Sequence, residues 1–428
     1  MGLILPTIIL YLILEGLFFC YQIFLYHIKT QPLTKPIPPN ESPRELFFKV
    51  LVQASKLKSY GVRRFMEGWF LGAKLQDIKR GNLKEFVCWG FVARSVEDLT
   101  EEEDEEIEGI VDSVIVEYKV NFEDGYNEEV SCCKMTLEDI EFIPRPLLLY
   151  VLIAMKQLAT YLILQMWGFR LRRVGGGMSY YHKVSSQGCE GDPLVLFHGL
   201  STGWGGYLPM VNVFRGREVF LINCPQISMS LDFKPLIPDV FTATVHSILS
   251  SHRVSSCIVV GHSFGTIQAA WLNKRHPSLI SSLVLLDPVC IGLSLPDVAC
   301  NFLYRKPSTF VEWLIYLMAS RELGISFILR RHFWWFHNVI WLEEEVLPNT
   351  KVIVGCGSGD EVACPIAVEE IVRRYNDSIL DTQPTSEDSP PPRQPIDFVS
   401  WKGFSHAQLL FNPGSIEEIH DMIEKSNI

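Results

Sequence analysis

The 428-residue sequence has little of what nucleic-acid, metal or cofactor binding would require. It carries 38 Lys and Arg against 49 Asp and Glu, a formal net charge of −11. A nucleic-acid-binding surface needs a basic face, so this class of partner is excluded. The 11 cysteines include no C-x-x-C pair, which argues against zinc ribbons and favours buried, reduced thiols. No metal-ligand cluster or nucleotide-binding fingerprint is present, and we expect no metal and no cofactor.

The N-terminus also lacks the features of a cleavable signal peptide. No basic residue precedes the apolar run 3–26, and no small-x-small cleavage site follows it. The run is long enough to cross a bilayer, so residues 1–28 are predicted to be a membrane anchor, although Glu15 lies within it. Lys29 and Lys35 on its C-terminal side favour a cytosolic location for the rest of the chain, at an endomembrane such as the endoplasmic reticulum or a lipid droplet.

The next 146 positions offer no recognisable chemistry. Residues 29–44 are rich in proline and are predicted to be an extended linker, and residues 45–174 form a mixed, largely helical region. The six carboxylates of 101–106 indicate a solvated helix face or loop, with a cation site as the alternative.

A second apolar stretch, 147–167, is interrupted by polar residues that fall on a narrow helical stripe. Lys156, Gln157 and Thr160 form this stripe, and Arg170 follows shortly after the stretch. Three interpretations remain open: a second membrane span, a helix in the membrane interface, or a helix packed on the rest of the protein. The stripe and the basic end favour the last two.

From Gly175 onward, short apolar segments alternate with helical ones. This pattern predicts an α/β fold with a mostly parallel sheet covered on both faces, occupying 175–428. Two insertions interrupt it: an aromatic-rich helical cap at about 290–348, and a polar, proline-rich flexible segment at 381–395. A helix is predicted at 238–251, and strands are predicted at 178–184, 193–197, 218–223, 256–260, 282–287, 351–355 and 396–401.

The most informative stretch is Gly261-His262-Ser263-Phe264-Gly265, which fits G-x-S-x-G between a buried strand and a helix. A serine on such a sharp turn adopts a strained backbone, and its neighbours two residues away must be small. The turn exposes the hydroxyl and directs the N-terminus of the next helix at it. Ser263 is therefore the candidate nucleophile.

A serine nucleophile needs a histidine base, and the base needs a carboxylate to orient it. In chain order, Asp360 follows the strand 351–355 and His406 follows the last strand. These are the candidate acid and base, with Glu361 and Asp287 as rival acids.

The backbone N–H groups of Leu200 and Phe264 are the candidate oxyanion hole. His198, Gly199 and His262, which flank these two donors in sequence, are predicted to contact the substrate.

These residues resemble the α/β-hydrolase superfamily, within it the AB-hydrolase-1 type. The resemblance covers roughly 175–428 and rests on His198-Gly199, the 261–265 motif, Asp360 and His406. The anchor and aromatic cap are also similar to membrane-anchored fungal members. The resemblance implies a Ser-His-Asp hydrolase, and Ser263 disfavours the epoxide and haloalkane hydrolases, which use aspartate at this turn. The region before Gly175 and the proline-rich insertion depart from the family pattern.

Because this fold hosts many reactions, the substrate stays a hypothesis. The anchor and the aromatic cap favour a membrane-associated serine hydrolase, of lipase or esterase type, that cleaves acyl esters of lipids. The alternatives are a thioesterase or C–C bond hydrolase, or a non-catalytic protein that binds lipid or a partner. The sequence identifies no protein partner.

Overall fold

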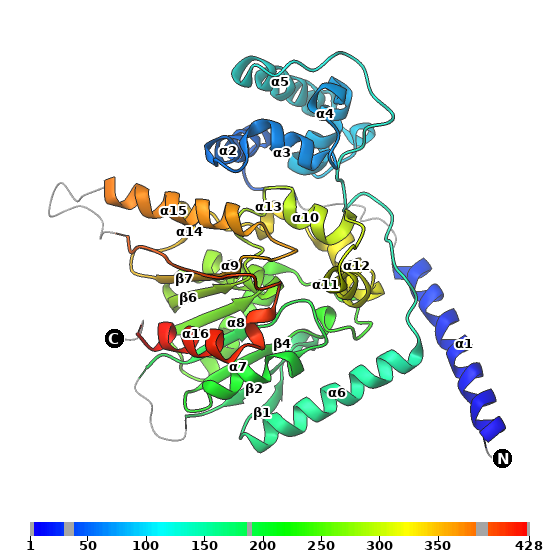
Figure 1. Cartoon of the computed structure of the whole chain (residues 1–428), viewed down its shortest axis with the longest axis vertical. Helices are drawn as coiled ribbons and strands as arrows, with labels where there is room; N and C mark the ends of the chain where they lie inside the picture. Colours follow the sequence, from blue (N-terminus) through cyan, green and yellow to red (C-terminus); the bar gives the residue numbers. More distant parts are fainter. Residues whose placement is uncertain (1–3, 30–37, 186–190, 382–392, 426–428) are drawn as a thin grey trace.

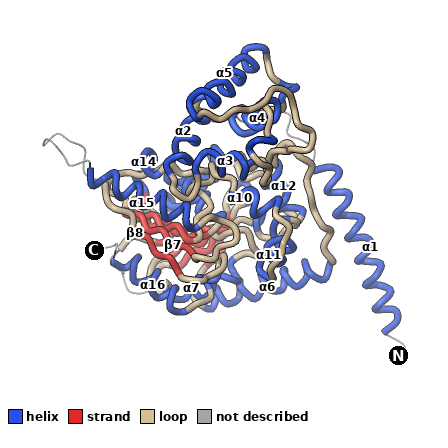
Figure 2. The backbone as a smooth tube through the Cα atoms, turned by 45° about the horizontal axis from the view of Figure 1, so that its top comes forward, coloured by secondary structure: helices blue, strands red, loops and turns tan. Residues whose placement is uncertain are grey.

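The C-terminal part of the chain is built on one eight-stranded sheet. The computed structural model describes residues 4–29, 38–185, 191–381 and 393–425. The strands β3 to β8 are parallel to one another in the sheet, whereas β1 pairs antiparallel with β2, and β2 antiparallel with β4, at one edge. Figure 2 shows the strands gathered inside a layer of helices. In the sheet order β1-β2-β4-β3-β5-β6-β7-β8, the strands are β1 Arg170–Arg173, β2 Ser179–Lys183, β3 Leu194–Phe197, β4 Val219–Asn223, β5 Cys257–His262, β6 Ile280–Leu286, β7 Lys351–Gly357 and β8 Asp397–Trp401.

Helices cover both faces of this sheet because successive strand residues point to opposite sides. In β5, Ile258 and Val260 join the core that contains α7 and α16, while Val259 joins the core that contains α8 and α9. The helices are α1 Ile4–Lys29, α2 Pro43–Lys56, α3 Gly61–Trp69, α4 Arg80–Val87, α5 Glu101–Tyr118, α6 Leu147–Met166, α7 Leu208–Val213, α8 Pro238–Ser251, α9 Phe264–Arg275, α10 Asp297–Ala299, α11 Phe310–Ile315, α12 Leu323–His332, α13 Trp335–Asn338, α14 Leu342–Glu345, α15 Pro365–Asp381 and α16 Pro413–Lys425.

The sheet begins earlier than the expected boundary at Gly175. Strand β1 pairs with β2 from Arg170↔His182 to Arg173↔Ser179. Its three arginines are exposed, because β1 is an edge strand with no strand on its other side. Such a strand lacks the apolar alternation by which a strand is predicted from sequence.

The helices α2 to α5 form a layer beside the helical block α10–α14, with α2 and α3 toward the block and α5 on the far side (Figure 1). Their buried side chains belong to the same hydrophobic core as those of that block. At the contact, the Lys49 ammonium lies 2.7 Å from Glu344 and 4.3 Å from the ring centre of Trp341. The carboxylate run begins α5, with Thr100 as its N-cap, where negative charge is favourable.

Two helices, α1 and α6, are long and apolar enough to cross a membrane. Helix α1 extends away from the body, and only Gln22 and Leu25 are buried along it (Figure 1). Helix α6 runs beside the domain that contains the sheet, with Ile153, Thr160 and Leu164 buried. Much of the predicted linker and most of the predicted 381–395 insertion lie outside the described residues.

Candidate active site

Ser263 lies in the turn between β5 and α9. Its backbone has φ 54° and ψ −122°, a conformation that costs an L-residue about 1–3 kcal/mol. The flanking glycines make the turn possible. A Cβ on Gly261 would lie 2.5 Å from the carbonyl oxygen of Gly265, and one on Gly265 would collide with the carbonyl of Phe197. The turn therefore requires glycine on both sides of the serine.

Two further loops bring a histidine and a carboxylate to Ser263. The Nε2 atom of His406 lies 2.9 Å from Ser263 Oγ, and its Nδ1 atom lies 2.7 Å from Asp360 Oδ2. The other carboxylate oxygen of Asp360 accepts the N–H groups of Val362 at 2.7 Å and Ala363 at 3.0 Å. These bonds hold the carboxylate in one orientation, so that it fixes the histidine ring.

The two rival carboxylates contact the same loop in other ways. Glu361 accepts the backbone N–H of His406 at 2.9 Å. Asp287, which is fully buried, accepts the backbone N–H of Ala407 at 2.7 Å. Both hold the histidine loop in place, whereas Asp360 contacts the imidazole itself.

This surrounding charge changes the basicity of His406. Burial alone would lower its pKa, but the charge of Asp360 and the hydrogen bond with it, together with the charges of Asp287 and Glu361, raise the pKa to about 9. The ring therefore holds its proton more firmly than an ordinary histidine.

A second hydrogen-bonded chain lies beneath the serine turn. The hydroxyl of Tyr207 accepts the N–H of Gly199 at 2.7 Å and lies 2.8 Å from His262 Nδ1. The other nitrogen of His262 lies 3.3 Å from Asp287. Since the Tyr207 hydroxyl donates to Nδ1, His262 donates from Nε2. The chain thus links the Gly199 turn to the loop of His406, and Tyr207 is a residue that sequence reasoning missed.

The structure places none of His198, Gly199 and His262, the predicted substrate contacts, along the pocket described next. His198 is fully buried: its Nδ1 donates to the Gly199 carbonyl at 2.9 Å and its Nε2 accepts the N–H of Cys224. Burial lowers the pKa of His198 to about 4 and also lowers that of His262. Both are neutral groups that support the turn, and neither lines the pocket described next.

Leu200 and Phe264, the predicted oxyanion donors, lie beside Ser263 at the pocket. Phe264 is the first residue of α9, where a helix leaves its N–H groups without a helical partner.

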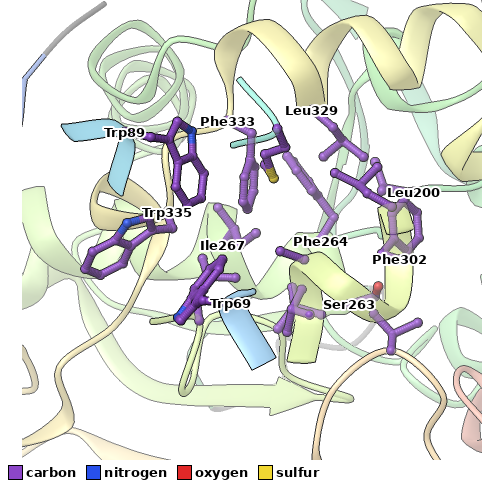
Figure 3. Close-up of a pocket in the computed structure, with 17 residues that line it drawn as sticks. Trp69, Trp89, Leu200, Ser263, Phe264, Ile267, Phe302, Leu329, Phe333 and Trp335 are labelled. Atoms are coloured by element: carbon purple, nitrogen blue, oxygen red, sulfur yellow. The ribbon is translucent and has the colours of Figure 1, made fainter. Parts of the chain in front are cut away.

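An apolar pocket borders Ser263; the space in it that no atom fills is about 610 Å³, a figure that includes open solvent, and its cavity volume is about 50 Å³. Figure 3 shows Ser263 at one end and the indoles of Trp89 and Trp335 toward the other. The walls come from three parts of the chain: the N-terminal helical region supplies Trp69, Trp89 and Met135, the helical block and its flanks supply Val289, Leu293, Val298, Ala299, Phe302, Leu303, Leu329, Phe333 and Trp335, and the ends of the sheet supply Leu200, Phe264, Ile267 and Val362.

The three tryptophans that line the pocket all use their indole N–H groups in hydrogen bonds within the protein. The three bonds run from Trp69 to the carbonyl of Ser294 at 3.3 Å, from Trp89 to the hydroxyl of Thr136 at 2.8 Å, and from Trp335 to the carbonyl of Gly90 at 2.8 Å. The pocket thus presents hydrocarbon along its length and a hydroxyl at Ser263. No sequence motif marks Trp69, Trp89 or Met135 as pocket residues.

Two groups of the described residues bring three possible metal-ligand atoms within 4.8 Å of one another. One is Asp287, Asp360 and His406: Asp360 is bonded to the His406 ring, and Asp287 accepts the N–H of Ala407. In the other, His182, Glu218 and His252, the His182 ring lies 2.8 Å from Glu218 and the His252 ring lies 2.9 Å from the Tyr180 hydroxyl. Hydrogen bonding accounts for both groups, and we assign a metal to neither.

Parts of this chain are similar to known proteins in sequence and in fold. Residues 192–315 match a family model described as the α/β-hydrolase fold. The sn-1-specific diacylglycerol lipase ABHD11 of Danio rerio is 27% identical over 116 residues, covering 26% of this chain and 36% of that protein. The (lyso)-N-acylphosphatidylethanolamine lipase of Mus musculus is 24% identical over 136 residues, covering 30% and 39%. The chain thus spans little more than a third of the length of these curated relatives.

Among solved structures, a bacterial membrane phospholipase A aligns with a TM-score of 0.45 at 16% identity, covering 65% of this chain and 93% of that one. The predicted fold is confirmed: the sheet order, the strained serine turn and the family match over residues 192–315 show that this chain has the α/β-hydrolase fold.

Proposed function

We propose that this protein is a serine hydrolase that cleaves acyl esters of lipids. One observation carries the proposal: the hydrogen-bonded series Asp360–His406–Ser263 lies at the end of a pocket whose walls are apolar. A serine hydroxyl bonded to an oriented imidazole is the arrangement that makes serine nucleophilic. The pocket offers an acyl chain an apolar environment that starts at the nucleophile.

The reaction would proceed in two halves. The oxygen of Ser263 attacks the ester carbonyl while Nε2 of His406 accepts the serine proton, and the N–H groups of Leu200 and Phe264 receive the oxyanion. Collapse of this intermediate breaks the bond to the alcohol, which leaves with the proton from His406. A water molecule then gives a proton to His406 and attacks the acyl-serine carbonyl. As the bond between the acyl group and Ser263 Oγ breaks, His406 returns the proton to Oγ and the fatty acid leaves. Asp360 stabilises the imidazolium in both halves.

The lipid and membrane parts of the proposal have separate support. Two curated relatives are named as lipases of diacylglycerol and of N-acylphosphatidylethanolamine. Helix α1 has the length and composition of a membrane anchor, and we propose that it holds the hydrolase domain at the cytosolic face of an endomembrane. A membrane-held enzyme meets its lipid substrate without extracting it into water first.

The proposal is tested with purified full-length protein in detergent micelles. Wild type and Ser263→Ala are assayed on 4-nitrophenyl esters from butyrate to palmitate and on a diacylglycerol. Wild type is expected to hydrolyse them, and the variant to lose activity by roughly a thousandfold or more. Equal activity in the variant would place catalysis elsewhere. A wild type that binds lipid but hydrolyses none of these esters would be a lipid-binding protein.

A further inference from the structure

Helix α6 has two faces of different character. Six apolar side chains point outward, each between 44% and 61% exposed: Leu148, Val151, Leu152, Met155, Leu158 and Leu162. The opposite side carries the buried residues Ile153, Thr160 and Leu164. Helices on the surface of a protein in water normally turn a polar face outward. The outer face of α6 is thus suited to an apolar surrounding.

Two other helices with exposed apolar side chains lie near the start of α6. The carboxylate of Glu15, in the middle of α1, accepts the N–H of Leu147 at the start of α6, at 2.9 and 3.1 Å. Just before α6, the guanidinium of Arg145 donates to the carbonyl of Leu317, directly after α11. Helix α11 exposes Phe310 and Trp313. The start of α6 therefore lies near both the apolar helix α1 and the C-terminal end of α11 (Figure 1).

The C-terminal end of α6 carries the side chains that favour the edge of a bilayer. Trp167 follows the helix, with the guanidinium of Arg215 4.9 Å from its ring centre. Arg170, Arg172 and Arg173 come next and are exposed. Tryptophan is enriched at the headgroup level, and arginine is attracted to anionic lipid headgroups. This combination matches a lipid surface better than a second copy of the chain.

The inner stripe of α6 contacts the turn that follows Leu200. Lys156 donates to the hydroxyl of Thr202. A Cβ added to Gly205 would lie 2.6 Å from Cε of Lys156 and 2.8 Å from the Thr160 hydroxyl. The chain therefore passes directly beneath α6, within a few residues of the oxyanion donor Leu200. A helix with its polar stripe bonded to protein in this way is not surrounded by lipid on all sides, as a second span would be.

We propose that α6 lies in the plane of the membrane interface, with its outer face among the acyl chains and its inner stripe against the oxyanion turn. The bilayer would hold α6, and α6 would hold the turn of residues 200–205, so that hydrolysis is faster at a lipid surface. This second part rests on the proposed function, whereas the position of α6 does not.

The position is tested by photolabelling. The full chain is reconstituted in vesicles of phosphatidylcholine and phosphatidylserine that contain a phosphatidylcholine with a diazirine in its acyl chain. After irradiation, mass spectrometry of peptides is expected to show label on α1 and on the outer residues of α6, and none on α5. Label on α1 but not on α6 would overturn the proposal, as would crosslinks that show α6 covered by a second copy. The result does not depend on catalysis.

The link to activity is tested with the double variant Leu152→Glu, Leu158→Glu. The control is Val116→Glu on α5, which is 75% exposed. The double variant is expected to lose label on α6 and to hydrolyse a long-chain ester in vesicles at least about tenfold more slowly. Its hydrolysis of soluble 4-nitrophenyl butyrate should equal that of wild type, and the control should match wild type in all three measurements.

If the double variant hydrolysed the vesicle ester as fast as wild type, the link between the membrane position of α6 and activity would be overturned. A wild type that hydrolyses neither ester would refute the proposed function, while the photolabelling still decides the position of α6.

Discussion

The two ends of the pocket are built in opposite ways. At one end, Ser263, Asp360 and His406 come from loops at the carboxyl ends of strands and are held by hydrogen bonds from backbone and side chains. At the other end, Trp69 and Trp89 come from helices far away in the sequence and are held mainly by packing, with one indole hydrogen bond each. The groups at the serine end are thus attached directly to the strands of the central sheet.

The difference follows from what each end must do. Proton transfer requires donor and acceptor within hydrogen-bond distance, and a shift of 1 Å is costly. An acyl chain requires only apolar area of the right shape, which many side-chain combinations can supply. Substitutions at the serine end are therefore expected to change rate, and those at the tryptophan end to change substrate preference.

The largest effect is expected for Ser263→Ala, which removes the nucleophile and leaves the pocket intact. Activity on any ester should fall by roughly 10³ to 10⁶-fold, measured as kcat on 4-nitrophenyl butyrate. The melting temperature should change little, because alanine keeps the same backbone turn. A large loss of stability together with activity would mean that the serine has a structural role, and the comparison between the two ends would fail.

A smaller loss is expected for Asp360→Asn, because the histidine would stay in place while losing its charged partner. By the general behaviour of such triads, kcat should fall by roughly 10³ to 10⁴-fold. Glu361→Gln is the matched control, since glutamine can still accept the N–H of His406. It should lose less than about tenfold at high pH. Similar losses in the two variants would mean that Asp360 is not the distinctive partner of the imidazole.

At the far end of the pocket, Trp89→Phe should change preference rather than rate. The smaller ring leaves room for more hydrocarbon, so the ratio of kcat/KM for long-chain over short-chain esters should rise roughly threefold to tenfold. Trp271→Phe is the control, because Trp271 is equally buried, donates a hydrogen bond of the same 2.8 Å length and does not line the pocket. If the ratio stayed unchanged in Trp89→Phe, this wall of the pocket would not determine the preference for acyl-chain length.

The smallest expected effect is a shift of the pH profile. The base must be neutral to accept the serine proton, so kcat/KM should rise with pH and level off only above the pKa of His406, raised to about 9. Glu361 contributes to that elevation, so Glu361→Gln should lower the pKa and move the rising limb to lower pH. If the rise of kcat/KM with pH in wild type were centred near pH 6, the neighbouring carboxylates would not raise the pKa of His406 as described.

The same contrast explains how much the sequence could predict. The helix predicted at 238–251 is found as α8 over the same residues, and the strand predicted at 351–355 is found as β7, two residues longer. The grouping of Ser263, Asp360 and His406 could be expected because parallel strands present their carboxyl ends at one edge. These features depend on local pattern and chain order.

What sequence reasoning missed depends on long-range packing. Tyr207 reaches His262 across 55 positions of the sequence, and Trp89 reaches the pocket only because its helix packs on the cap. His198 is predicted from its motif to contact the substrate, but in the structure it is buried and bonded to the backbone. A motif indicates which residues are near the chemistry, and only the fold shows which of them face the pocket.

The most direct test of the central claim is the chemical reactivity of Ser263. Full-length wild type, Ser263→Ala and His406→Ala are treated with a fluorophosphonate, and the modified peptide is identified by mass spectrometry. The account predicts one adduct on Ser263 in wild type and none in either variant. A folded wild type that stays unmodified, or an adduct that forms equally well without His406, would contradict the claim that the imidazole activates this serine.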